Sequence, residues 1–358
     1  MASRKQRDGF DLVSLPKAEL HLHLEGSMRF ETLVSLCKKH NIQVPPDTRG
    51  QQFEDFSKFA DVYVAACECL RDESDIYRLV LEVAQDAAKS GATWIEPALS
   101  IMLYAERFDG IEAALRVLAE AAEKAESETN VGIGFILAVE RHFPVSQAEM
   151  MANIVHKVTI TDEESRRIQI FGRPAIVGFG LHGPEEGYPP EPFANAFKIA
   201  CEGTGVISVP HAGEFAPFPG DGAKSVRGAI STLKAKRIAH GVLSVNDNAV
   251  LQEIVEKNIC LDICVSSNQL LGVVDSIGSH PLRNLIDSGV PCTINSDDSL
   301  LFGCNLLCEY AICRDALGLS DEMLASLAQT SFQHSCAPRA VIEDGCNGIK
   351  RWLNNRSG

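Results

Sequence analysis

Two patterns of hydrophobic residues alternate along this chain. Short runs rich in Val, Ile and Leu predict buried β-strands, and the segments between them carry apolar residues at helical spacing. The predicted helices include 75–90, 111–128, 191–202, 246–257 and 280–288. Eight strands are predicted, at residues 17–24, 92–100, 131–139, 175–182, 205–214, 237–242, 259–267 and 291–298.

Eight strand-then-helix units in 358 residues favour a single α/β domain, a (β/α)8 TIM-type barrel that spans residues 1–358. A doubly wound open sheet is disfavoured because no Gly-x-Gly-x-x-Gly turn follows the first strand. No linker, repeat or low-complexity segment indicates a second domain. In such a barrel the active site lies at the carboxyl ends of the strands.

The segment between the first strand and the helix at 75–90 is longer than a barrel needs. It contains Phe53, Phe56, Phe59, Tyr63 and Cys67 at helical spacing. We therefore expect a helical insertion after the first strand, with a lid over the barrel mouth at residues 45–75. An ordinary helix packed on the barrel wall is the alternative.

Composition narrows the classes of partner. The hydrophobic content is 45%, and no stretch approaches the length of a membrane span. The first ten residues include basic residues but no following apolar stretch, so we expect a cytoplasmic protein. The formal charge of -15 and the dispersed basic residues disfavour nucleic acid and anionic membranes. A small uncharged or cationic substrate fits better, and the twelve scattered cysteines are expected to be reduced.

Polar side chains collect where the predicted strands end. His21 and His23 stand at i and i+2 on the first strand, so both are expected to face the barrel interior. His211, His240 and an Asp297-Asp298 pair follow at later strand ends. Histidines and an aspartate from separate strands form the ligand set of a metal site that activates water. Each motif alone is weak, and together they predict a hydrolase.

Glu214 closes the string Pro210-His211-Ala212-Gly213-Glu214 at the end of the fifth strand. A carboxyl buried in a barrel mouth holds its proton more strongly and can serve as a general acid. The alternative is a glutamate that merely caps the next helix. His240 is predicted as a ligand or as a base acting on water, and Asp297 and Asp298 are expected to divide metal and substrate contacts.

Four strings in this order resemble the adenosine deaminase family of the amidohydrolase superfamily: His21-x-His23-Leu24-Glu25-Gly26-Ser27, His211-Ala212-Gly213-Glu214, His240-Gly241 and Ser296-Asp297-Asp298. The resemblance spans nearly the whole chain. It implies one Zn²⁺ per chain, held by His21, His23, His211 and Asp297. It also implies a small-molecule purine substrate.

The resemblance also implies catalytic and substrate-binding roles. Glu214 would protonate purine N1, while His240 positions the attacking water and helps to deprotonate it. Asp298 would hydrogen-bond N7 and steer the water, and the backbone N–H of Gly183 would meet N3. The H-x-E and P-C-x-x-C signature of cytidine-type zinc deaminases is absent from this chain. The implied reaction is hydrolytic deamination of an adenine nucleoside, adenosine or a close analogue, to a 6-oxopurine and ammonia.

Departures from the adenosine-specific pattern keep the substrate open. Glu25 stands where enzymes acting on adenosine often have an aspartate that meets the ribose. The fourth strand ends in His182-Gly183-Pro184-Glu185, unlike the usual Ala-Gly-Asp-Glu. A 6-aminodeoxyfutalosine or adenine-type base deaminase is the alternative, and another metal-dependent C–N or ester hydrolase of the superfamily is a further one. His280, before Pro281, is expected to begin a helix, and it either shapes the site or only caps that helix.

Overall fold

Eight parallel strands form the ring at the centre of the computed structural model, which describes residues 10–53, 56–160, 168–216 and 218–355. A bridge between Leu22 and Asp297 joins the first strand to the end of the last, so the barrel is nearly closed. The predicted (β/α)8 barrel is confirmed. In ring order the strands are β1 Lys17–His23, β2 Ala92–Leu99, β4 Phe135–Glu140, β7 Ile176–His182, β8 Ile207–Ala212, β9 Arg237–His240, β10 Cys260–Ile263 and β11 Cys292–Ile294.

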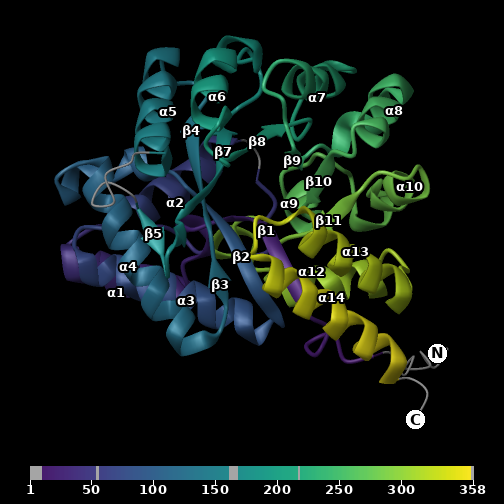
Figure 1. Cartoon of the computed structure of the whole chain (residues 1–358), viewed down its shortest axis with the longest axis horizontal. Helices are drawn as coiled ribbons and strands as arrows, with labels where there is room; N and C mark the ends of the chain where they lie inside the picture. Colours follow the sequence, from purple (N-terminus) through teal and green to yellow (C-terminus); the bar gives the residue numbers. More distant parts are fainter. Residues whose placement is uncertain (1–9, 54–55, 161–167, 217, 356–358) are drawn as a thin grey trace.

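Helices surround this ring (Figure 1). Three further strands have two residues each. The strand β3 Gly132–Ile133 pairs with β2, and β5 Gln169–Ile170 pairs with β6 Arg173–Pro174 in an antiparallel hairpin. The helices are α1 Phe30–His40, α2 Phe56–Glu68, α3 Glu73–Lys89, α4 Ile111–Thr129, α5 Val145–Ile160, α6 Ala194–Cys201, α7 Asp221–Ser231, α8 Asn248–Glu256, α9 Val265–Leu270, α10 Leu282–Asp287, α11 Ser299–Phe302, α12 Leu306–Asp315, α13 Asp321–His334 and α14 Arg339–Asn354.

At the seventh predicted strand, residues that we expected in a strand form a helix instead. We expected the strand to run to Ser267, but β10 ends at Ile263 and α9 begins at Val265. The buried carboxylate of Glu309 explains the early helix start, because it accepts hydrogen bonds from the N–H groups of Val265 and Ser266 at 3.0 and 3.2 Å. The first backbone N–H groups of a helix have no acceptor within the helix, so a carboxylate that accepts from them stabilises the helix start.

The insertion after β1 contains α1 and α2. Residues 54–55 of the predicted lid lie outside the described residues. The next helix, α3, begins with a capping box in which Asp72 and Asp75 each accept a hydrogen bond from the other's backbone N–H. Cys67 is buried in the core, whereas Phe59 is only partly buried and packs against Phe302 with ring centroids 5.8 Å apart. The insertion is therefore anchored to the barrel by apolar contacts.

Charged side chains fill part of the barrel interior. Nη1 of Arg237 lies 2.7 Å from Oε2 of Glu96, and its Nε donates to Oδ2 of Asp262 at 2.9 Å. All three residues are almost fully buried. The indole N–H of Trp94 donates to the other oxygen of Glu96. A buried charge is tolerated only when it is paired in this way.

One expectation about the cysteines is wrong. Cys304 and Cys308 form a disulfide at the start of α12, where a separation of four residues brings their Cα atoms to 5.5 Å. The other ten cysteines are free, as expected. Within the described part of the chain, no helix combines the length and the apolar character that crossing a membrane requires.

Candidate active site

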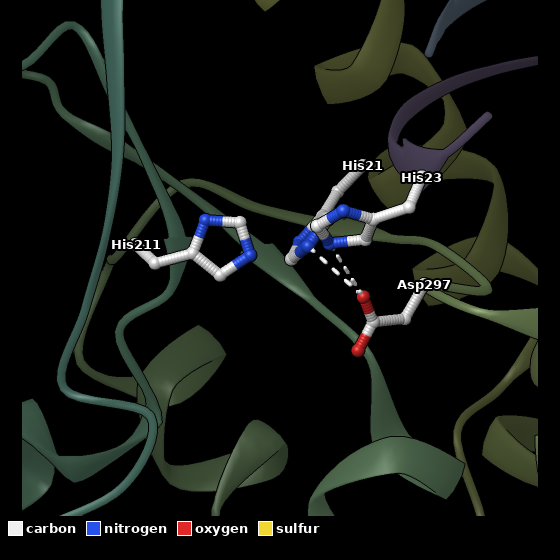
Figure 2. Close-up of side chains that lie close together, drawn as sticks. All are labelled: His21, His23, His211 and Asp297. Atoms are coloured by element: carbon white, nitrogen blue, oxygen red, sulfur yellow. Dashed lines mark ion pairs between the residues drawn. The ribbon is translucent and has the colours of Figure 1, made fainter. Parts of the chain in front are cut away.

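Three histidines and one aspartate converge at the carboxyl ends of β1, β8 and β11. Nε2 of His21 and Nε2 of His23 lie 3.3 and 3.2 Å from Oδ1 of Asp297, and Figure 2 shows His211 across from this pair. One donor atom from each of the four side chains lies within 4.8 Å of the others, and all four residues are buried. The structure thus brings together the four residues predicted as metal ligands.

The donor atoms fit a divalent metal such as Zn²⁺. Nδ1 of His21 lies 3.1 Å from the carbonyl oxygen of Asp262; since a carbonyl can only accept, Nδ1 holds the proton and Nε2 presents its lone pair. Nε2 of His21 and Oδ1 of Asp297 are buried without a hydrogen-bond partner among the described residues. Ligands about 2.0–2.2 Å from a tetrahedral zinc are about 3.3–3.5 Å from one another, close to the distances seen here.

Two residues at this site have a strained backbone conformation. His240 and Asp297 have φ angles of 63° and 61°, in the left-handed region that non-glycine residues seldom adopt. The pairing of β1 with β2 is irregular between Glu19 and Leu22. There the side-chain oxygen of Asn295 accepts the N–H groups of both Leu20 and His21. These contacts hold the two strand ends in the conformations that direct His21 and Asp297 at each other.

Glu214 faces His240 beside the histidine cluster. Its Oε1 lies 3.3 Å from Nε2 of His240. Burial raises the pKa of Glu214 to about 8, and the charges of Asp297 and Glu185 act in the same direction. A carboxyl with this pKa holds its proton at neutral pH, as a general acid must. The acid role of Glu214 stays a prediction, and the helix that follows begins only at Asp221, seven residues beyond Glu214.

A second carboxylate holds the loop that carries Glu214. Oε1 of Glu185 accepts the N–H groups of Glu214 and Phe215 at 2.7 and 3.0 Å. Its Oε2 accepts the N–H of Gly213 at 2.9 Å and the hydroxyl of Ser225. Four donors on one carboxylate define the path of the backbone from Gly213 to Phe215, and Glu185 thereby positions Glu214.

A chain of hydrogen bonds orients His240. The N–H of Leu282 donates to Nδ1 of His280 at 3.1 Å, so Nε2 of His280 carries its proton and donates to Oδ1 of Asn268 at 3.1 Å. The amide nitrogen of Asn268 then donates to Nδ1 of His240 at 3.3 Å. His280 precedes α10 rather than beginning it, and it both bonds the helix start and reaches the site.

Asp298 and Gly183 lie on the wall of the same cavity. Burial, and then the neighbouring charge of Asp297, raise the pKa of Asp298 well above its ordinary value. A Cβ atom at Gly26 would lie 1.6 Å from Oδ1 of Asp298, so only glycine leaves space for this carboxyl. Gly183 has a φ angle of 92°, which also favours glycine.

The cavity has a volume of about 230 Å³ and opens beside α2, from which Phe59, Tyr63 and Val64 contribute to its wall. Glu25 is fully buried and does not line it. Its Oε2 accepts from the hydroxyl of Tyr63 at 2.9 Å, and its Oε1 accepts from the N–H of Ser100 at 3.2 Å. Contact between Glu25 and a substrate stays a prediction, since Tyr63 and Ser100 stand between the Glu25 carboxylate and the cavity.

Several residues at the site escaped the sequence argument. Glu140 and His182, at the ends of β4 and β7, line the cavity, as does Ser100. Burial raises the pKa of Glu140 to about 7. The available signal was its position directly after the predicted strand 131–139. Glu185 gave no such signal, because its partners lie 28 to 40 residues further along the chain.

Comparison with known proteins identifies the family. The family model described as adenosine deaminase matches residues 16–350. The chain belongs to the adenosine deaminase family. A relative from Streptomyces coelicolor, named putative adenosine/adenine deaminase, is 34% identical over 96% of this chain and 98% of its own length. Aminodeoxyfutalosine deaminase from the same species is 33% identical over 90% of this chain and 81% of its own.

Among solved structures, adenine deaminase from Arthrobacter aurescens superposes with a TM-score of 0.82. It shares 26% identity with this member of the adenosine deaminase family and covers 95% of this chain and 99% of its own. These comparisons confirm the predicted family and the enzyme class, a purine aminohydrolase. The relatives' names differ in their substrates, so the substrate of this chain has to be argued from its own residues.

Proposed function

We propose that this protein is a zinc-dependent aminohydrolase that acts on the 6-amino group of an adenine nucleoside, adenosine or a close analogue, with adenine itself and 6-aminodeoxyfutalosine as alternative substrates. The observation that carries the proposal is the position of Glu214: a carboxyl that stays protonated at neutral pH faces the same cavity as the His21, His23, His211 and Asp297 cluster. A general acid beside a water-activating metal is what attack on a neutral purine ring requires.

The proposed ligands of one zinc ion are His21, His23, His211 and Asp297, which offer the nitrogen and carboxylate donors that zinc accepts. When bound, zinc would lower the pKa of water and so supply a nucleophile at neutral pH. Residues of the chain bind the substrate, orient the water and transfer protons. His240 and Asp298 face the cavity and orient the attacking water, and Asp298 also binds N7.

In the proposed reaction, water adds across the C6–N1 bond of the purine. Its oxygen bonds to C6 while Glu214 delivers a proton to N1, which removes the negative charge that N1 would otherwise develop. One proton of the water replaces the proton that Glu214 donated, and the other moves from the oxygen to N6 as the C6–N6 bond breaks, so that ammonia leaves. The product carries a carbonyl at C6 and a hydrogen on N1. The backbone N–H of Gly183 is proposed to meet N3, which places the ring edge opposite C6 beside β7.

We also propose that the insertion at 45–75 covers the barrel mouth within one domain. Phe59, Tyr63 and Val64 of α2 on the cavity wall support this role. Exclusion of water around the reacting atoms would strengthen the electrostatic contribution of Glu214.

Ammonia release tests the proposal. The protein, purified with one equivalent of zinc, is assayed with adenosine, deoxyadenosine, adenine, adenosine monophosphate and 6-aminodeoxyfutalosine, and kcat/KM is compared. We expect turnover of at least one of these compounds. Release of ammonia from none of them by fully zinc-loaded protein would refute the proposed activity. Glu186→Gln, at an exposed residue away from the cavity lining, serves as the matched charge control for variants of buried glutamates.

A further inference from the structure

Glu140 is a carboxylate on the cavity wall with 14% of its side chain exposed, and within the described residues no lysine or arginine forms an ion pair with it. Its Oε1 accepts a hydrogen bond from the hydroxyl of Ser100 at 3.2 Å. Nδ1 of His182 lies 3.9 Å from Oε1, and Nδ1 of His142 lies 4.0 Å from Oε2; both distances are too long for a hydrogen bond. Within the described residues no group donates to Oε2 of Glu140. This oxygen lies on the cavity wall, where a ligand can donate a hydrogen bond to it.

Glu140 and Gly183 are neighbours on the cavity wall. A Cβ atom at Gly183 would lie 3.1 Å from Oε2 of Glu140, so this oxygen stands directly beside the Gly183 backbone. In the purine ring, N3 and N9 are bonded to the same carbon. If the N–H of Gly183 meets N3, Oε2 of Glu140 faces the N3–N9 edge, on the side of the ring away from Glu214 and the metal ligands.

The charge of this part of the cavity favours a hydrogen-bond donor. The described residues that line the cavity include Glu140 and Asp298 but no lysine and no arginine. A phosphate would therefore meet a carboxylate with no cation to offset the repulsion. A donor on N9, or on a short group attached to it, would instead satisfy the free oxygen of Glu140.

We propose that Glu140 is a specificity-determining residue that accepts a hydrogen bond from a donor at the N9 edge of an adenine substrate and discriminates against substrates that carry a phosphate there. The donor is either the N9–H of the free base or a hydroxyl of a short N9 substituent. The proposal rests on the proposed function, because it needs an adenine ring bound with C6 toward the metal ligands. It adds a substrate contact that Glu25, behind Tyr63 and Ser100, does not make.

The experiment compares four substrates across four proteins. Adenine supplies N9–H, 9-methyladenine lacks any donor at N9, adenosine supplies hydroxyls, and adenosine monophosphate adds a phosphate. Values of kcat/KM are measured for wild type, Glu140→Gln, Glu140→Leu and the control Glu186→Gln. A substrate that is not turned over is measured as a competitive inhibitor, so every combination yields a number.

We expect Glu140→Leu to lower kcat/KM for the preferred donor-bearing substrate by about 10- to 100-fold, with little change in binding or turnover of 9-methyladenine. A larger loss of kcat/KM for adenine in Glu140→Leu identifies the donor as N9–H, and a larger loss for adenosine identifies it as a hydroxyl. Glu140→Gln is expected to raise kcat/KM for adenosine monophosphate relative to kcat/KM for adenosine, because it removes the negative charge and keeps the shape of the side chain. Glu186→Gln is expected to match wild type.

Two results would overturn the inference: an equal loss for all four compounds, which indicates a structural role, or an unchanged ratio of donor-bearing substrate to 9-methyladenine in Glu140→Leu. Neither result touches the proposed function, which fails only if zinc-loaded wild type deaminates none of the adenine compounds. The two failures are therefore distinguishable.

Discussion

The substitution Glu185→Gln tests whether the loop carrying the proposed acid is positioned by a single carboxylate. Glutamine keeps one oxygen, but its NH2 group would replace the other oxygen. The NH2 group cannot accept hydrogen bonds from the donors that the replaced oxygen binds in wild type. If the NH2 takes the place of Oε2, the N–H of Gly213 loses its acceptor, and if it takes the place of Oε1, the N–H groups of Glu214 and Phe215 lose theirs. Either arrangement leaves at least one backbone donor unpaired.

The expected magnitude follows from these contacts. A hydrogen bond to a charged group contributes about 1.5–3 kcal/mol, and each 1.36 kcal/mol corresponds to about tenfold in rate. If displacement of the loop raises the free energy of the transition state by about 1.5–3 kcal/mol, kcat falls by about 10- to 150-fold. Glu185 does not line the cavity with Glu214, so KM is expected to change much less than kcat.

Steady-state kinetics on the best substrate, together with zinc content and a urea titration, measure this effect. We expect Glu185→Gln to bind zinc normally while its kcat drops, and the adjacent Glu186→Gln to behave as wild type. Unchanged kcat in Glu185→Gln would refute the positioning role. A loss of zinc that parallels the loss of activity would instead assign the effect to damage at the metal site.

Three further predictions follow from the same geometry. Glu214→Gln removes the proposed proton donor, so kcat is expected to fall by about 10²- to 10⁴-fold with zinc binding intact, and near-normal turnover would exclude the acid role. Dialysis against a chelator is expected to abolish ammonia release and lower Tm, and added zinc to restore both; turnover that survives metal removal would contradict the proposed cofactor. Arg237→Met leaves Glu96 and Asp262 without their cation and is expected to lower the free energy of unfolding by about 3–5 kcal/mol in urea titrations, whereas a loss below about 1 kcal/mol would contradict the buried ion-pair argument.

Much of the barrel could be predicted because its strands are buried on both faces and carry continuous apolar runs. Histidines and carboxylates at the ends of those runs were visible for the same reason. Predictions failed where a distant residue decides the local structure. The seventh strand gives way to α9 because Glu309, 44 residues beyond Val265, binds the helix start. No local pattern at residues 259–267 contains that information.

Residues that act through other residues were the hardest to find in the sequence. Glu185 looked like part of a departure from the family's strand-end pattern, and only the structure shows its four donors. The left-handed conformations of His240 and Asp297 are likewise invisible in a hydrophobicity pattern. Strain of this kind is maintained by surrounding contacts, which for His240 include the amide of Asn268.

The hydrogen bonds from Leu282 to His240 bear directly on the chemistry. Because the N–H of Leu282 can only donate, Nδ1 of His280 accepts and its proton lies on Nε2. The side-chain oxygen of Asn268 therefore accepts from His280, and its NH2 group donates to His240. Neutral His240 therefore accepts at Nδ1 and carries its proton on Nε2, the nitrogen that faces Glu214. A nitrogen that already holds a proton donates to water rather than deprotonating it. This arrangement favours the proposal in which His240 orients the attacking water and Glu214 supplies the proton to the purine.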